Sequence, residues 1–186
     1  TLSLLNKTPR SSVLNSYISY YKALAYMGQN KAGKALKLLP VQTVLSQKIA
    51  WDRFWLRQDA LASLKMSSEL SSEISAVKKK YHKDKWVKIK SEFYLGKAAY
   101  LSGDKTLAKK YLHTVLIELA GTEFDHRIFS ILKKTGDKKY KVLSESGWNK
   151  RAEKLIGNGF AYKATKIYEW YAQKKSGKPK NYYLEK

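Results

Sequence analysis

Runs of lysine with aromatic residues between them are the part of this sequence whose residue types could do chemistry. One run covers residues 78–90, and further runs cover 133–141 and 174–183. Lysine ammonium groups attract anions, while aromatic faces stack on sugar rings or nucleic-acid bases. The candidate partner contacts are Lys79, Lys80, Lys83, Lys85, Trp86, Lys138, Lys139 and Tyr140. The alternative is that these runs are solvated helix ends, where the helix dipole favours cations.

The balance of basic residues indicates which kind of anion these runs would attract. The 186-residue chain has a formal net charge of +22, and only five of its 37 basic residues are arginines. Lysine acts as a point charge, whereas base readout and bidentate phosphate binding favour arginine. The composition therefore favours diffuse attraction to a polyanion over sequence-specific nucleic-acid recognition. Peptidoglycan with its peptide carboxylates, teichoic acid, a membrane surface and bulk nucleic acid all qualify.

No complete catalytic or metal-binding motif accompanies the basic runs. The three histidines, His82, His113 and His126, lack metal-ligand spacing and an accompanying carboxylate cluster. The chain has no cysteine, and it has neither a phosphate-binding loop nor a dinucleotide fingerprint. The sequence therefore predicts no metal, no cofactor and no catalytic site within this chain.

Apolar residues recur at helical spacing along nearly the whole chain, and no segment alternates like a strand over five or more residues. The expected helices cover residues 11–28, 30–40, 43–66 as one helix or two, 67–81, 84–102, 104–119, 122–132, 148–158 and 160–175. The apolar face of the first helix consists of Val13, Leu14, Tyr17, Ile18, Tyr21, Leu24 and Ala25. The pattern predicts an all-α protein.

Local signals fix several of the expected helix ends. Asn30 and Asp84 are expected N-caps, because their short polar side chains can accept from the first free backbone amides. Gly103 is expected to end one helix, and Asp104, the next residue, is expected to begin another. In the helix that follows Asp84, we expect Trp86 to face inward.

Turn glycines followed five residues later by a small residue indicate a helical repeat. The spacing occurs at Gly103 and Ala108, and again at Gly159 and Ala164. The tetratricopeptide pattern uses such spacing with a period of about 34 residues, which this chain does not keep. We expect antiparallel helix pairs stacked as a short tetratricopeptide-like α-superhelix of roughly 8–10 helices. Residues 1–175 would form a single domain with a soft boundary near 133–147, followed by a polar tail at 176–186.

The segment from Trp148 to Ala164 carries a more specific pattern. Arg151-Ala152, Leu155, Gly159 and Ala164 resemble the Arg-Ala-x-x-Leu-x-x-x-Gly-x-x-x-x-Ala helical hairpin of soluble lytic murein transglycosylases. The resemblance is specific over residues 148–170, and the pair at 95–116 is similar more loosely. It implies the non-catalytic α-superhelical region that precedes the catalytic domain in that family, and hence a periplasmic or cell-wall location in a bacterium.

The chain departs from that family where catalysis would be expected. The catalytic domain of the family carries a Glu-Ser motif followed by a Gly-Leu-Met-Gln stretch. Here Glu145-Ser146 is followed by a helical hairpin, and no Gly-Leu-Met-Gln occurs. Such chemistry also needs a glutamic acid in a hydrophobic pocket beside a sugar cleft, whereas we expect Glu145 in a loop. A parent protein could be a lytic transglycosylase, but this chain would be its non-catalytic part.

The expected function is that of a helical scaffold that binds an anionic polymer, with peptidoglycan as the first candidate and nucleic acid as the second. The alternative is a tetratricopeptide-like adaptor that binds a peptide or helix of another protein, for which Trp51 and Trp55 are the candidate groove residues. Residues 1–10 lack the apolar run of a signal peptide, and no stretch reaches the roughly 20 apolar residues of a membrane span.

Overall fold

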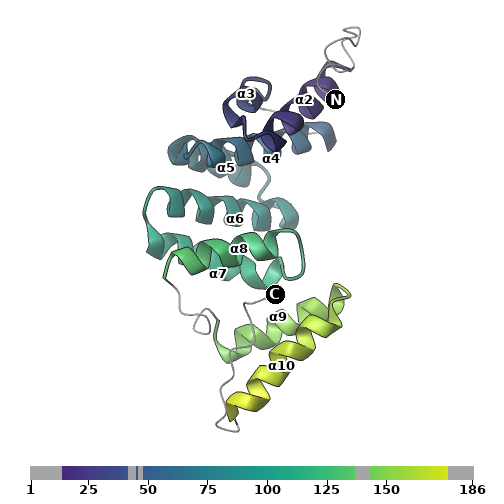
Figure 1. Cartoon of the computed structure of the whole chain (residues 1–186), viewed down its shortest axis with the longest axis vertical. Helices are drawn as coiled ribbons and strands as arrows, with labels where there is room; N and C mark the ends of the chain where they lie inside the picture. The colour runs from purple at the N-terminus through teal and green to yellow at the C-terminus, as the bar shows by residue number, and fades with distance from the viewer. Residues whose placement is uncertain (1–13, 42–44, 46–47, 137–142, 176–186) are drawn as a thin grey trace. The chain divides into compact units, whose positions relative to one another are not determined.

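The computed structural model of the chain describes residues 14–41, 45, 48–136 and 143–175. Within these ranges the chain forms nine α-helices and no strand (Figure 1), which confirms the all-α prediction. The helices are α2 (Asn15–Gly28), α3 (Ala32–Lys37), α4 (Lys48–Ser63), α5 (Ser67–Lys80), α6 (Lys85–Leu101), α7 (Lys105–Glu118), α8 (Phe124–Lys134), α9 (Glu145–Gly157) and α10 (Ala161–Lys175).

The chain divides into two compact units, Thr1–Ser72 and Glu73–Lys186, and the division falls within α5. Helices α2, α3 and α4 belong to the first unit, and α6 to α10 belong to the second. The single-domain organisation and the tetratricopeptide-like superhelix stay predictions.

The first unit is held by small residues that let its helices approach closely. Ala23 of α2 and Ala35 of α3 are fully buried and pack with Leu39, which follows α3. Two arginines of α4 tie this helix to its neighbours. The Nη1 atom of Arg53 donates to the Ser16 hydroxyl at 3.1 Å, and that of Arg57 donates to the Leu39 carbonyl at 2.6 Å.

Two expectations for the first unit are wrong. Asn30 does not cap α3: its φ is +56°, so it closes the α2–α3 turn in the left-handed region that asparagine tolerates. The residue before α3 is Lys31, which makes no side-chain capping bond. The apolar face of α2 is also largely exposed, because α2 packs through the opposite side, where Ala23 lies.

In the second unit, α6 and α7 form the antiparallel pair that the sequence predicts (Figure 1). The Asp84 carboxylate accepts from the Val87 amide at 3.0 Å and so caps α6. Gly103 has a φ of +90°, which glycine adopts readily, and ends this helix. The Asp104 carboxylate then accepts from the Leu107 amide at 2.9 Å and starts α7. Both predicted caps are thus confirmed.

The last helical pair, α9 and α10, is anchored to the α7–α8 region by one arginine. Arg151 of α9 donates to both carboxylate oxygens of Asp125 in α8 at 2.8 Å, and also to the Leu116 carbonyl of α7. The Asn158 amide adds a bond to the Ala120 carbonyl at 2.9 Å. Residues of the pair form an apolar core together with Ala120, which follows α7; the core consists of Ala120, Trp148, Ala152, Leu155, Ala164, Ile167, Trp170 and Tyr171.

Helix α9 begins earlier than the sequence predicted. The Ser144 hydroxyl accepts from the Gly147 amide at 3.2 Å and caps the helix, so Glu145 is its first residue. The expectation that Glu145 lies in a loop is therefore wrong. A serine cap followed by glutamate in the first turn is a favourable helix start, since the dipole stabilises a carboxylate there.

Candidate functional site

The connection between α5 and α6 brings five of the predicted contact residues together on exposed surface. All four lysine side chains, at positions 79, 80, 83 and 85, are exposed, and Trp86 is 49% exposed. We call Lys79, Lys80, Lys83, Lys85 and Trp86 the basic turn. The other three predicted contacts, at positions 138–140, lie outside the described residues.

The exposure of Trp86 corrects the prediction that it faces inward. The buried stripe of α6 runs through Val87, Ser91, Tyr94 and Ala98, at spacings of four, three and four residues. Trp86 lies one position before this stripe, in the first turn of the helix, where its ring reaches solvent. Because the ring is exposed, the indole face of Trp86 is available for contact with a partner.

Not every lysine of the 78–90 run belongs to the basic turn. Lys78 forms an ion pair with Glu92 of α6, and its ammonium lies 5.9 Å from the centre of the Tyr111 ring. The bond joins α5 to α6 and gives Lys78 a structural role. Lys80 also lies over an aromatic ring, 5.6 Å from the centre of Tyr81, but its side chain stays exposed.

The helix dipoles account for the positions of Lys79 and Lys80 but not for that of Lys85. Lys79 and Lys80 occupy the last turn of α5, where the helix dipole stabilises cations. Lys85 occupies the first turn of α6, where the dipole opposes a cation, and this turn contains no acidic residue. Its nearest counter-charge is Glu118 of α7, whose carboxylate lies 3.7 Å from the ammonium groups of both Lys85 and Lys154.

A second cationic surface lies in a hollow of about 810 Å³ between α8, α9 and α10. We call it the α8–α10 hollow. Lys133 of α8 and Lys163 and Lys166 of α10 bring positive charge to it, and Phe129, Trp148 and Tyr162 contribute aromatic surface. Lys133 begins the basic run at 133–141, whereas Lys163, Lys166 and the three aromatic residues belong to none of the basic runs in the sequence.

The arginine in this hollow is already engaged. The Arg151 side chain is only 5% exposed, and its guanidinium holds Asp125 in a two-pronged ion pair. A guanidinium in this arrangement cannot also clamp a phosphate or carboxylate of a ligand. The charge available to a ligand therefore comes from the lysines.

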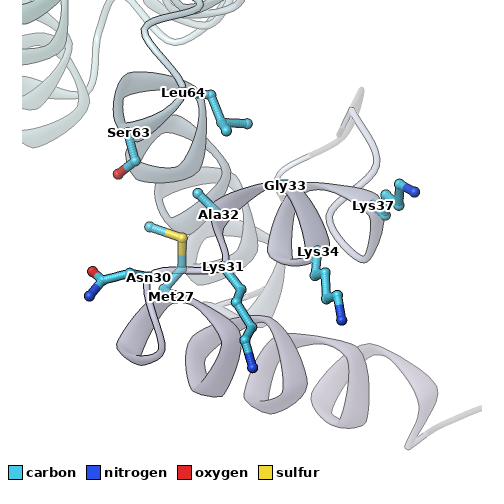
Figure 2. A pocket seen from close by; sticks show the side chains of 9 residues that line it. All are labelled: Met27, Asn30, Lys31, Ala32, Gly33, Lys34, Lys37, Ser63 and Leu64. Atoms are coloured by element: carbon cyan, nitrogen blue, oxygen red, sulfur yellow. The ribbon is translucent and has the colours of Figure 1, made fainter.

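A third group of lysines surrounds a hollow of about 590 Å³ at the α2–α3 turn in the first unit (Figure 2). Figure 2 shows the Lys31 and Lys34 side chains extending away from Ser63 and Leu64. Lys31 bonds to the Gln29 side chain at 2.9 Å, and Lys34 lies 5.9 Å from the centre of the Tyr26 ring. These contacts favour a structural role.

Glu145 lacks the surroundings of a catalytic acid. Its side chain is exposed at the start of α9, and no hydrophobic pocket encloses it. Its charge instead acts on a neighbour: burial, with a smaller effect of the Glu145 carboxylate, raises the pKa of Tyr171 to about 12. In the described part of the chain, no three histidine, aspartate or glutamate side chains gather closely enough to hold a metal ion.

Among the helices described, none is long and apolar enough to cross a membrane. Comparison of the sequence with protein-family models, with curated proteins and with solved structures finds no match.

Proposed function

We propose that this chain is a non-catalytic helical module that binds an anionic polymer, and that peptidoglycan is that polymer. The observation that carries the proposal is the basic turn, where four exposed lysines and an exposed tryptophan lie within eight consecutive residues. Long-range attraction by the net charge of +22 would bring the polymer to the surface. The basic turn would then provide the contacts.

The position of Lys85 is the strongest support for a binding role over simple solvation. The helix dipole opposes a lysine in the first turn of α6, and the ion pair of Lys85 with Glu118 joins two exposed side chains, so it contributes little to stability. A contact with an external anion would add a stabilising partner. The exposed Trp86 ring next to it in the sequence adds an aromatic face on which a sugar ring can pack.

Two features favour peptidoglycan over nucleic acid. Peptidoglycan presents scattered carboxylates on amino sugars, which suits separate point charges and a flat aromatic ring. Phosphate clamps and base readout favour arginine, and the basic turn contains none. The resemblance of residues 148–164 to the helical region of lytic transglycosylases supports the same choice, and with it a tetratricopeptide-like stacking of helix pairs and a periplasmic or wall-associated location.

Charge reversal at the basic turn tests the proposal. A variant with Lys79, Lys80, Lys83 and Lys85 changed to glutamate has its formal net charge lowered from +22 to +14. We expect its retention on insoluble sacculi to fall at least tenfold in a co-sedimentation assay at low salt. A smaller variant, Lys83→Glu with Lys85→Glu, leaves the last turn of α5 intact. We expect its retention on sacculi to fall several-fold.

The matched control reverses four exposed lysines elsewhere in the second unit and reaches the same net charge of +14. Its substitutions are Lys105→Glu, Lys110→Glu, Lys134→Glu and Lys150→Glu. If the control loses as much retention as the basic-turn variant, the attraction is generic. Wild-type retention by the basic-turn variant would contradict the proposal outright.

A protein-binding adaptor is the second candidate, and one observation favours it. The outer stripe of α2 is apolar: Leu14, Tyr17, Tyr21 and Leu24 are each between 44% and 52% exposed. Apolar residues at such helical spacing suit an amphipathic helix of another protein. The predicted groove residues do not support it, because Trp55 is 8% exposed and stacks on Trp51 with ring centres 5.8 Å apart. Binding through the α2 stripe would depend little on salt, unlike binding to a polyanion.

A further inference from the structure

The α8–α10 hollow carries positive charge that no carboxylate of the described residues neutralises. Arg151 and Asp125 neutralise one another and hold α8 and α9 together. Within the described residues, no carboxylate lies within ion-pair distance of Lys133, Lys163 or Lys166. Three like charges around one hollow repel one another, so an anion placed between them would be stabilised.

Aromatic side chains give this hollow a second kind of surface. Tyr162 is 62% exposed, and Phe129 is half-buried on the facing helix α8. The Lys163 ammonium lies 4.9 Å from the centre of the Phe160 ring and 5.8 Å from the centre of the Tyr162 ring. These cation–π contacts favour a defined position for the ammonium beside the exposed tyrosine ring.

We infer that the α8–α10 hollow binds an acidic amino sugar, with the carboxylate between the lysines and the sugar ring against Tyr162. The inference rests on the proposed function and deepens it, since a carboxylated amino sugar is part of the peptidoglycan repeat. The volume of about 810 Å³ lies within the range of about 300–1,000 Å³ typical of ligand pockets. The exposed Ser130 hydroxyl at its edge can bond a sugar hydroxyl.

The surroundings of the hollow disfavour other anions. A bidentate phosphate clamp uses an arginine fork, and Arg151 is committed to Asp125. Acidic peptide motifs are typically recognised by clusters of arginines, and Arg151 is the arginine that lines the hollow. A compact ring with a single carboxylate meets neither difficulty.

Titration with a soluble disaccharide tests the inference. The probe is N-acetylglucosaminyl-N-acetylmuramic acid, and chitobiose serves as the uncharged disaccharide of similar shape. We expect the acidic disaccharide to shift the amide resonances of residues around Phe129 and Tyr162 in two-dimensional NMR spectra. We expect chitobiose to bind at least tenfold more weakly.

Two variants locate the binding. Lys163→Glu combined with Lys166→Glu should weaken binding of the acidic disaccharide at least tenfold, whereas Lys105→Glu combined with Lys110→Glu, on exposed positions of α7, should retain it. Tyr162→Ala leaves every charge in place and should weaken binding several-fold. Its exposed ring makes loss of folding an implausible cause.

The outcomes separate this inference from the proposed function. If wild-type protein is retained on sacculi but does not bind the acidic disaccharide, the inference about the hollow is wrong and the proposed function stands. If it neither binds the disaccharide nor is retained on sacculi, both are wrong. Equal affinity for chitobiose, or displacement of the disaccharide by equimolar tetraglutamate, would also overturn the inference.

Discussion

Arg151 shows how one side chain can organise several helices. Its guanidinium reaches Asp125 of α8 and the Leu116 carbonyl of α7 from a position on α9, and it is almost fully buried. A buried charge is tolerated only when its partners replace the lost hydration. The arrangement makes Arg151 a structural residue.

Removing the Arg151 side chain should therefore destabilise the protein strongly. We expect Arg151→Ala to lower the free energy of unfolding by about 3 kcal/mol, because the partly buried Asp125 carboxylate is left without its counter-charge. Urea denaturation followed by circular dichroism measures the change. Lys150→Ala on the exposed face of the same helix is the control and should stay within about 0.5 kcal/mol of wild type. Similar stabilities for the two variants would rule out this role.

Tyr171 gives the stability of the protein an alkaline pH dependence. Burial and the Glu145 charge raise its pKa to about 12, above the ordinary value near 10. Between about pH 10 and pH 12 the unfolded chain has lost this proton while the folded chain keeps it. The free energy of unfolding should therefore fall as the pH rises through this window.

Tyr171→Phe tests this pH dependence, because phenylalanine cannot ionise. We expect its free energy of unfolding to decline less steeply than that of wild type between pH 10 and pH 12. Glu145→Gln, which removes the smaller contribution to the shift, should give an intermediate slope. Denaturant titrations at half-unit pH steps measure the slopes, and identical slopes for wild type and Tyr171→Phe would exclude Tyr171 as the source.

At the residue scale, the sequence predicts local contacts and misses distant ones. Asp84 and Asp104 could be recognised as caps because each accepts from an amide only three residues away. The partners of Arg151 lie 26 and 35 residues away, and no local pattern reveals them. Lys163 and Lys166 were missed for the same reason, since they line one hollow with residues of α8 only in the folded chain.

At the element scale, the α6–α7 pair depends on a glycine at its interface. A Cβ atom on Gly96 would lie 2.9 Å from Cγ of Leu112, which is fully buried and has little room to move. The glycine thus allows the two helices to approach closely. Its role explains why a residue of poor helix propensity occupies the middle of a 17-residue helix.

Gly96→Val should separate the two helices. We expect a loss of about 2 kcal/mol or more in the free energy of unfolding, because overpacking in a filled core forces side chains from their rotamers. Gly157→Ala in α9 is the control, since no atom lies within 4 Å of its added Cβ, and it should be neutral or slightly stabilising. Thermal denaturation compares the two, and equal effects would show that the Gly96 contact is unimportant.

Apolar periodicity predicted which segments form helices, but it did not always predict which face of a helix is buried. Periodicity identifies a face, and in α8 the buried residues Phe124, Ile128, Ile131 and Leu132 form the apolar face, as in most amphipathic helices. In α2 the more apolar face, with Tyr17 and Tyr21, is exposed, while Ala23 lies in the core. At the interface of α2 and α3, small residues allow the two helices to pack closely. A pattern of hydrophobicity alone does not predict this, because alanine is only weakly hydrophobic.

At the scale of the whole molecule, the net charge of +22 affects both the stability of the fold and its association with a partner. Charge of one sign opposes compaction through self-repulsion and raises the rate of encounter with a polyanion. Generic attraction of this kind would treat peptidoglycan and DNA alike. The proposed function requires more, namely that the basic turn and its exposed tryptophan distinguish a carboxylated glycan from a phosphate polymer.

Co-sedimentation with insoluble sacculi across a salt series, with and without excess double-stranded DNA, tests that requirement most directly. The account predicts retention that weakens as salt rises, because screening reduces the lysine contacts, but that persists at physiological salt in the presence of DNA. Complete displacement by DNA, or no retention even at low salt, would contradict it.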